Sequence, residues 1–290
     1  MRVRAASILT LVLFALALGL SACGSSVKST VDPVAAAAEK TVAAKTVNYS
    51  MTIDEQTPLL PTPLSITAEG ALDFTHEQMS MSMDMSQIAS LGGSELGSPS
   101  DWKMEAVVDG LVMYMKAPFL QKLTKSDKPW IKIDMGNLGK QQGLDLSSLM
   151  SYDPSQLTRF VDYLRGSKNM EIVGHDQIRG VTTTHYRGSV DFDTYLNALP
   201  AGRRAAAKQA LDKVGKLGKV TYKPFDVWVD ANGLIRREKI GYSVDTGANG
   251  KLDLGFSMDF YDYDGPVSIT IPPADQTVDM MQLAGSLGSS

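Results

Sequence analysis

The sequence predicts an α+β fold in which a large antiparallel sheet carries a few helices packed on one of its faces. Stretches of alternating apolar and polar residues predict strands with one buried face. Short turn signals join consecutive stretches, which indicates antiparallel pairing. An alanine-rich segment near the start and two later segments have helical patterns, and a sheet with a few added helices is an α+β layer arrangement.

The first 22 residues predict a bacterial lipoprotein signal peptide. Arg2 and Arg4 precede an apolar run from residue 8 to residue 20, and the run ends in Leu-Ser-Ala before Cys23. A positive start, a short apolar core and small residues before the cut are typical of secretory signals. A cysteine after Leu-Ser-Ala indicates a lipobox, in which the thiol is acylated. We therefore expect Cys23 to carry a diacylglyceryl group and acyl chains such as palmitate, and to anchor the protein at the outer face of the bacterial cytoplasmic membrane.

The segment behind the lipobox divides into a tether, a domain and a tail. Residues 23–30 are small and polar and predict a flexible tether. The alanine-rich stretch from Val31 to Thr46 predicts a helix, with Asp32 as its cap and Pro33 in its first turn. We expect residues 31–275 to form a single domain, and the small, polar residues 276–290 to form a flexible tail.

Alternation from Val47 onward predicts the strands of the first half. Asp109-Gly110 is a hairpin turn signal between two of these strands. Residues 86–100 and 136–152 predict loops, and a helix is expected from Asp153 to Leu164. Further strands are expected at 66–74, 79–85, 104–108, 111–115 and 131–135.

The second half repeats the pattern around a helix at 193–214. Arg179-Gly180 and the run 230–233 are the turn signals. Strands are expected at 169–178, 181–192, 223–231, 234–245, 251–263 and 266–271.

Charge and cysteine content exclude several classes of function. The formal net charge is −4, and binding of nucleic acid needs a basic face, so no nucleic-acid partner is expected. Cys23 is the single cysteine, which rules out an internal disulfide and a zinc site built on paired cysteines. After the signal peptide, no apolar run is long enough for a second membrane span.

Residues for catalysis are sparse, and we expect no enzymatic activity, no cofactor and no bound metal. His76, His175 and His185 are the three histidines, and none has a metal-ligand or nucleophile neighbour in the sequence. The chain contains no Gly-x-Ser-x-Gly elbow and no phosphate-binding glycine loop. The acidic cluster of Asp259, Asp262 and Asp264 lacks the spacing of a calcium loop and is interpreted as solvated hairpin turns.

The 15 methionines, most of them alternating along strands, leave three interpretations open. They could be ordinary core, the lining of a cavity for flexible apolar ligands, or a thioether copper site. The run Met79–Met85 extends over about 20 Å of strand, which suits a lining better than a chelate. The residues expected on the inner, ligand-lining face are Met81, Met83, Met104, Met113, Met115, Ile131, Ile133, Leu254, Phe256 and Met258.

Three stretches carry a resemblance to a known family. The first runs from Gly174-His175-Asp176 through Gly180-Val181 to Gly188, the second is Val227–Arg236, and the third runs from Gly265-Pro266 to Pro272. With the lipobox and the alanine-rich helix, they resemble the mycobacterial LppX/LprG lipoprotein family of actinobacteria. The resemblance covers roughly residues 31 to 275 and implies a LolA/LolB-like half-barrel, a large curved antiparallel sheet with helices on its concave face.

The resemblance also implies a function. Members of that family bind acylated lipids or glycolipids between the sheet and its helices and take part in carrying them within the cell envelope. We therefore expect a lipid or glycolipid ligand, with an envelope transporter or another partner protein as a further candidate partner. The alternative is an envelope sensor or protein-interaction module that uses the same fold without lipid transport, because a fold does not fix a function.

Overall fold

A computed structural model describes residues 33–88, 98–137, 167–190 and 218–283, apart from single positions at 59, 61, 125, 248 and 249, and also residues 196, 204 and 208. Cys23, the signal peptide, the tether and the helices expected at 153–164 and 193–214 lie outside these ranges or almost entirely so.

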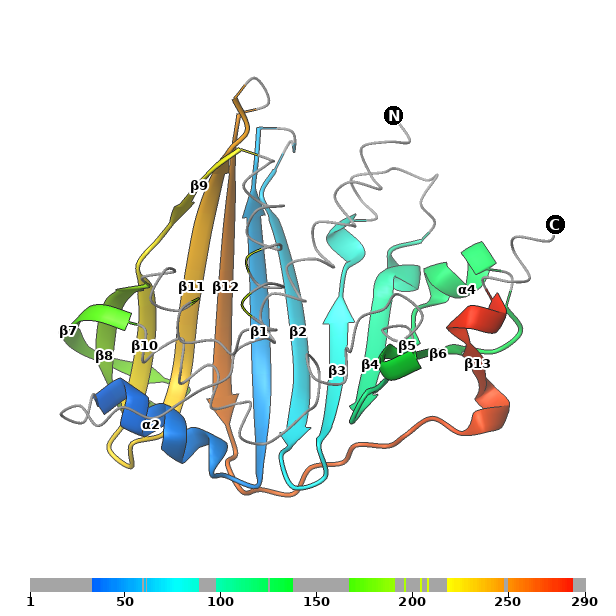
Figure 1. Cartoon of the computed structure of the whole chain (residues 1–290), viewed down its shortest axis with the longest axis horizontal. Coiled ribbons are helices and arrows are strands. Elements are labelled where there is room, and N and C mark those ends of the chain that lie inside the picture. The colour runs from blue at the N-terminus through cyan, green and yellow to red at the C-terminus, as the bar shows by residue number, and fades with distance from the viewer. Residues whose placement is uncertain are drawn as a thin grey trace.

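The described residues form a curved, unclosed, mostly antiparallel sheet of 13 strands (Figure 1). The strand order along the sheet is β13-β6-β5-β4-β3-β2-β1-β12-β11-β10-β8-β7, and β9 pairs separately with β11. This half-barrel confirms the predicted fold class. The strands are β1 (Thr46–Gln56), β2 (Leu64–Asp73), β3 (Gln78–Asp84), β4 (Lys103–Asp109), β5 (Val112–Lys116), β6 (Trp130–Asp134), β7 (Ser167–Ile178), β8 (Val181–Val190), β9 (Lys219–Tyr222), β10 (Phe225–Asp230), β11 (Ile235–Asp245), β12 (Lys251–Tyr261) and β13 (Thr277–Asp279).

Tight turns between neighbouring strands explain the antiparallel pairing, as the turn signals predict. Gly110 joins β4 to β5 with φ of 54°, and Gly233 joins β10 to β11 with φ of 73°. Between β7 and β8, Arg179 and Gly180 both have positive φ, 47° and 79°. Only glycine adopts this left-handed region without strain, so three of these four turn positions carry the residue that the geometry favours.

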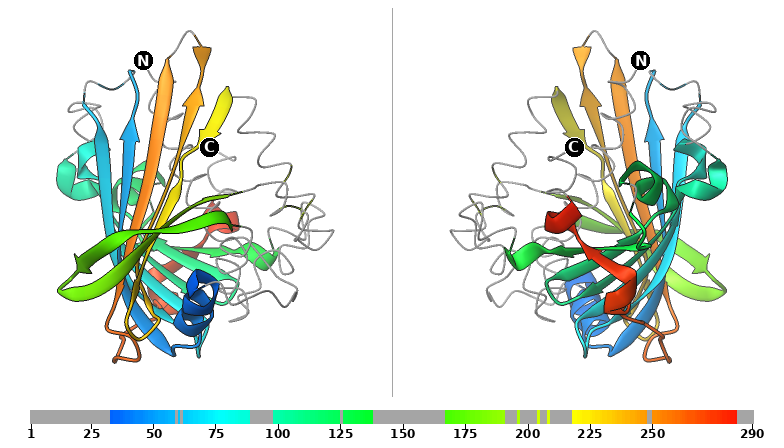
Figure 2. Two further views of the ribbon diagram at one scale, coloured as in Figure 1. Left: turned by 90° about the vertical axis from the view of Figure 1, so that its left-hand side faces the viewer. Right: turned by 90° about the vertical axis from the view of Figure 1, so that its right-hand side faces the viewer.

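Helix α2 (Pro33–Val42) lies against the inner face of the sheet over β10 and β11 (Figure 2). Its first residue is Pro33, whose missing N–H costs nothing at a helix start. Val34, Ala37, Ala38 and Thr41 form the buried stripe, with the spacing of one helix face. The predicted end at Thr46 was wrong, because the chain bends after Val42 and Thr46 already pairs with Asp73 in the sheet.

A second helix lies near the other end of the strand order. Helix α4 (Pro118–Thr124) follows β5, and a 3-10 helix (Pro99–Trp102) precedes β4. The rings of Phe119 and Trp102 stack with centroids 4.5 Å apart and planes inclined by 6°. This aromatic pair joins the two short helices and covers the methionines of β3 and β4.

The carboxyl-terminal region differs from its prediction in two places. Residues 266–271, expected as a strand, form no strand. Their alternation is interrupted at both ends by prolines, which cannot donate to a ladder. The segment expected as a tail from residue 276 contains β13, which pairs with β6 in parallel as the edge of the sheet. A 3-10 helix (Ala274–Gln276) precedes it.

Candidate functional site

The strand register assigns each side chain to one of the two faces of the sheet. Directly opposed residues on neighbouring strands share a face. One such row runs from Met258 to Met51 and Ala68, and continues through Met83 to Met104, across five strands. Four of these five residues are methionines, and Met258 lies far in the sequence from the other three. This row identifies a predominantly apolar surface on the concave side of the sheet, the side that α2 covers at one end.

We call this surface the apolar face. Its members on the central strands are those that the register connects with the methionine row. They are Val47, Tyr49, Met51, Ile53 and Glu55 of β1; Leu64, Ile66, Ala68, Gly70 and Leu72 of β2; Met79, Met81 and Met83 of β3; Met104, Ala106 and Val108 of β4; Met113 and Met115 of β5; Ile131 and Ile133 of β6; Phe225, Val227 and Val229 of β10; Glu238, Ile240, Tyr242 and Val244 of β11; and Leu252, Leu254, Phe256, Met258 and Phe260 of β12.

All ten residues expected on the inner face belong to the apolar face, so the alternation predicted the correct face of the sheet for each of them. Five of them are buried: Met81, Met83, Met104, Ile131 and Leu254. The other five, Met113, Met115, Ile133, Phe256 and Met258, are half-buried. Their shared face is a consequence of the register, whereas their role in lining a cavity stays a prediction.

The sequence reasoning missed several members of this surface. Met51 lies at the centre of the methionine row, and Ile240 lies on β11, two strands from β1 in the strand order. A period-2 reading that continued along β1 from Val47 would have included Met51. The β-bulge at Trp228/Val229 shifts the register of β10 against β11, so no turn-based count would have paired β11 correctly.

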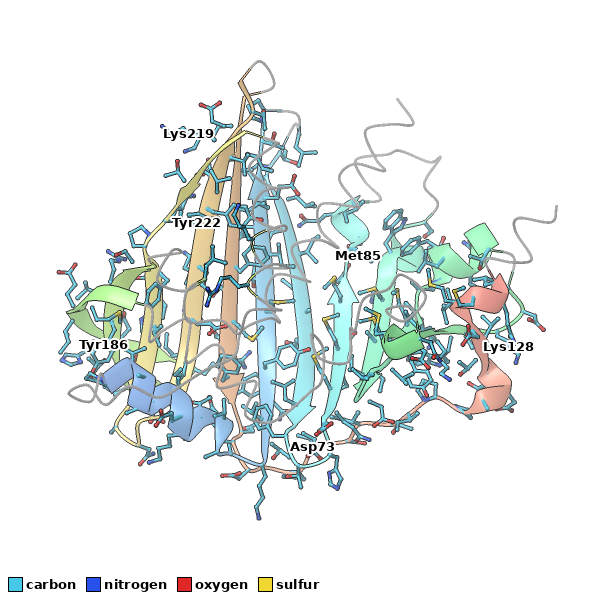
Figure 3. All side chains as sticks on the ribbon, viewed as in Figure 1. Asp73, Met85, Lys128, Tyr186, Lys219 and Tyr222 are labelled. Carbon is cyan, nitrogen blue, oxygen red and sulfur yellow. The ribbon has the colours of Figure 1, made fainter. Side chains whose placement is uncertain are left out.

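The buried residues of the apolar face fall into three clusters rather than one core. One lies under the short helices and contains Ile66 and Met83, one lies under α2 and contains Val227, and one contains Val47 and Leu72. Half-buried side chains connect them: Met51 packs on the first and third, and Phe260 on the second and third. Figure 3 shows side chains along the whole length of the strands, with Met85 and Tyr222 marking positions on either side of the central strands.

Two carboxyl groups interrupt the apolar face. Glu55 is 5% exposed, and burial raises its pKa above the ordinary value. Burial also raises the pKa of Glu238, to about 8. One oxygen of each carboxyl, Oε2, is buried and makes no hydrogen bond within the part of the chain that the structure describes. Near Glu55, burial raises the pKa of Tyr242 to about 12.

The outer face carries paired charges instead. Arg237 donates from Nε and Nη2 to the two oxygens of Asp259, at 2.5 and 2.7 Å. Interpreting Asp259 as part of a solvated turn was therefore wrong, because it lies on β12 in a largely buried ion pair with a neighbouring strand. His185 lies 2.8 Å from Asp226 and stacks on Trp228, with ring centroids 4.1 Å apart.

Within the described ranges, no three side chains of histidine, cysteine, aspartate or glutamate gather as a metal site would require. In the same ranges no helix has both the length and the apolar character needed to cross a bilayer.

No family model matches the chain. A curated relative, an uncharacterized 31.2 kDa protein from the rplA-rplJ intergenic region of Streptomyces griseus, is 30% identical over 170 residues, which are 56% of this chain. The chain spans about half the length of that relative, 52%.

Similar solved structures include two mycobacterial lipoproteins. LppX of Mycobacterium tuberculosis matches with a TM-score of 0.44 and 15% identity, over 83% of this chain and all of LppX. LprF of Mycobacterium bovis matches with a TM-score of 0.44 and 14% identity, over 83% of this chain and 96% of LprF. A LolA superfamily protein of Nitrosomonas europaea has a TM-score of 0.28 and 9% identity, over 83% and 93% of the two chains. The chain thus resembles solved structures of the LppX type, as predicted, and a function for it has to be argued from its own residues.

Proposed function

We propose that this protein binds the acyl chains of a lipid or glycolipid on its apolar face and carries that lipid within the cell envelope. The observation behind the proposal is a set of four half-buried side chains, Met51, Phe256, Met258 and Phe260, which pack against three separate buried clusters. Met51, Phe256 and Met258 lie at the centre of the sheet, where an ordinary core would be fully buried. Methionine is flexible and polarisable, so such a surface adapts to irregular apolar guests.

The energetics of acyl transfer favour a surface of this size. Burying a methylene group stabilises by roughly 0.8 kcal/mol, so a chain of about sixteen carbons costs on the order of 12 kcal/mol in water. A carrier must replace most of that with apolar contacts. The methionine row alone crosses five strands, about 19 Å at ordinary strand spacing, which is close to the length of such a chain.

Attachment through Cys23 would keep this surface beside its membrane. Nine residues lie between Cys23 and Pro33, where α2 begins on the inner face of the sheet. A flexible linker of nine residues would have a root-mean-square span of about 15–18 Å. We place the protein at the outer face of the bacterial cytoplasmic membrane, and the proposal assigns no catalytic step to the chain.

Native mass spectrometry of the protein purified from its host's envelope tests this proposal. We expect a co-purifying lipid mass that is lost in the double variant Met113→Asp plus Phe256→Asp. The control is Tyr114→Asp plus Ser257→Asp, which changes the adjacent positions of the same strands on the outer face. A lipid-free mass for the unaltered protein, or loss of lipid in both double variants, would overturn the proposal.

A second candidate function is a protein-interaction module of the envelope. Strand β7 is the last strand of the sheet order, and its Ile172 and Val173 are 63% and 41% exposed. Apolar side chains on an edge strand suit the addition of a strand from a partner protein. The double variant Ile172→Lys plus Val173→Lys would abolish pull-down of such a partner and leave a bound lipid in place.

A further inference from the structure

The apolar face contains two carboxyl groups among otherwise uncharged side chains. Of the residues that the register places on this face, Glu55 and Glu238 are the two that carry a carboxyl group. Both lie on central strands, β1 and β11, rather than at the rim of the sheet. A carboxyl group on such a surface opposes folding unless it has a partner.

Glu55 continues the inward-facing alternation of β1. Its neighbours Asp54 and Gln56 point outward and are exposed, whereas Glu55 is 5% exposed and opposes Leu64 and Leu254. An acid at this position is therefore enclosed by two leucines rather than by water.

Glu238 lies at the end of the methionine row. It opposes Met258 on β12 and Val227 on β10, and Val227 belongs to the cluster beneath α2. Oε2 of Glu238, like Oε2 of Glu55, is buried and makes no hydrogen bond to the described part of the chain.

Two other buried acids of this chain have partners. Asp230 accepts hydrogen bonds from the N–H groups of Asn232 and Leu234 and from Arg236. Asp259 is held by both guanidinium nitrogens of Arg237. The chain therefore pairs these carboxyls where they serve structure, whereas Glu55 and Glu238 both lie on the surface that we propose for the ligand. Buried polar groups in proteins are nearly always hydrogen-bonded, so an unpaired one needs an explanation, and an oxygen of the ligand would supply the missing partner.

The chemistry of the site favours an uncharged oxygen as that partner. Burial favours the protonated form of both acids, in which each offers an O–H donor. A free fatty acid would bring a second acid to the same place, and two acids in one apolar site oppose each other's ionisation. A ligand amine would have to lose its hydration for one ion pair with no supporting hydrogen bonds. An ester carbonyl or a hydroxyl accepts the O–H without either cost.

We infer that Glu55 and Glu238 donate hydrogen bonds to ester or hydroxyl oxygens of the bound lipid, so that the site takes neutral acylated glycerol or glycolipid rather than free fatty acid. This inference depends on the proposed lipid-binding function. The two residues lie two strands and four residues apart, roughly 17 Å at ordinary strand dimensions. They therefore contact separate oxygen groups of one ligand.

Photolabelling of the full chain in membranes tests the inference. Phosphatidylcholine vesicles containing the chain receive dipalmitoylglycerol or palmitic acid, each with a diazirine in its acyl chain. Label on peptides of β1 and β12 is then measured by mass spectrometry. We expect dipalmitoylglycerol to label these peptides at least fivefold more than palmitic acid does at equal membrane concentration.

Variants separate hydrogen bonding from packing. Glu55→Gln and Glu238→Gln keep an N–H donor and should retain labelling within twofold, whereas Glu55→Leu and Glu238→Leu should lower it at least fivefold. The leucine variants remove a buried unpaired polar group and are expected to fold. The control is Glu69→Leu, an exposed outer-face position on β2. Equal labelling by the two probes, or full labelling of the leucine variants, would overturn the inference and leave lipid binding in place. Failure of both probes to label the unaltered chain would overturn the proposed function itself.

Discussion

Arg179 donates a hydrogen bond of 2.9 Å to the hydroxyl of Ser50, which lies 129 residues earlier in the chain. Arg179 is at the tip of the β7–β8 hairpin, and Ser50 is on β1, four places from β8 in the strand order. The contact forms because the hairpin extends across the outer face of the sheet (Figure 2). The guanidinium also lies 4.0 Å from the ring centroid of Tyr261 on β12.

We predict that Arg179→Ala lowers the free energy of unfolding by about 0.5–1 kcal/mol, the usual size of an exposed cation–π contact. The side chain of Arg179 is 43% exposed, so its ion pair with Asp259 at 3.7 Å adds little. Alanine keeps the same strain at φ of 47°, and urea unfolding therefore reports the lost side chain alone. Lys239→Ala, at an exposed position on β11, is the control and should change stability by less than about 0.5 kcal/mol.

The ion pair of Arg237 and Asp259 should contribute more. Its side chains are 36% and 11% exposed, and the contact is bidentate. We expect Asp259→Ala to destabilise by about 1.5–3 kcal/mol, because the arginine then keeps a desolvated charge without a partner. In a double-mutant cycle, Arg237→Ala plus Asp259→Ala should reveal a coupling of about 1–2 kcal/mol. If the changes in unfolding free energy of the two single variants simply add up in the double variant, water screens the ion pair.

Glu238 gives the stability a pH dependence of known sign. Its pKa is about 8 in the folded state against an ordinary 4.5, so the folded state keeps a proton that the unfolded chain releases. This group's contribution to stability is therefore fully present below about pH 4.5, falls as pH rises to about 8, and is constant above. Glu238→Gln should remove the loss and exceed the unaltered protein in stability at pH 9 by on the order of 3–5 kcal/mol.

Chemical denaturation of both proteins from pH 5 to pH 9 checks this prediction. Only the difference between the two curves is used, because the other titrating groups are common to both. A difference that does not change with pH would show that Glu238 is ionised in the folded state.

Two glycines of the sheet should respond oppositely to alanine. A Cβ at Gly70 would lie 2.0 Å from the carbonyl oxygen of Ser80 and 2.7 Å from the hydroxyl of Tyr49. We expect Gly70→Ala to destabilise by about 1–3 kcal/mol through overpacking. A Cβ at Gly255 meets nothing closer than Asp54 at 3.8 Å, so Gly255→Ala should be neutral or stabilise by up to about 1 kcal/mol. Thermal unfolding of the two variants, each compared with the unaltered protein, tests both expectations.

Thr41 joins α2 to the sheet. Its hydroxyl oxygen accepts a 3.0 Å hydrogen bond from the N–H of Ile235. The carbonyl oxygen of Ile235 accepts a hydrogen bond from the hydroxyl of Tyr263. Thr41→Val keeps the shape but leaves a buried N–H without a partner, which costs about 1–3 kcal/mol. Thr41→Ser keeps the acceptor and should lose less than half as much. Hydrogen exchange at Ile235 should accelerate in the valine variant alone.

Much of the strand pattern could be predicted because alternation and turn chemistry are local. Asp109-Gly110 and Arg179-Gly180 mark hairpins wherever their strands pair, and the parity of Met83 or Phe256 depends on its own strand. The end of α2 could not be predicted as well, because it depends on the pairing of Thr46 with Asp73 in the sheet. The strand expected at 266–271 failed for a local reason, since the prolines at both ends of this stretch cannot donate to a ladder.

The sequence by itself determined most of the strands, most of their turns and which side chains share a face with the methionines, because these properties depend on residues two to four positions apart. Only the tertiary structure decided that Asp259 meets Arg237, that β13 pairs in parallel with β6, and that an oxygen of Glu55 and of Glu238 lies buried without a partner among the described residues. Those outcomes depend on strand order, on a bulge and on sheet curvature. Each of these is fixed by contacts between segments that are distant in the chain, so no local pattern carries them.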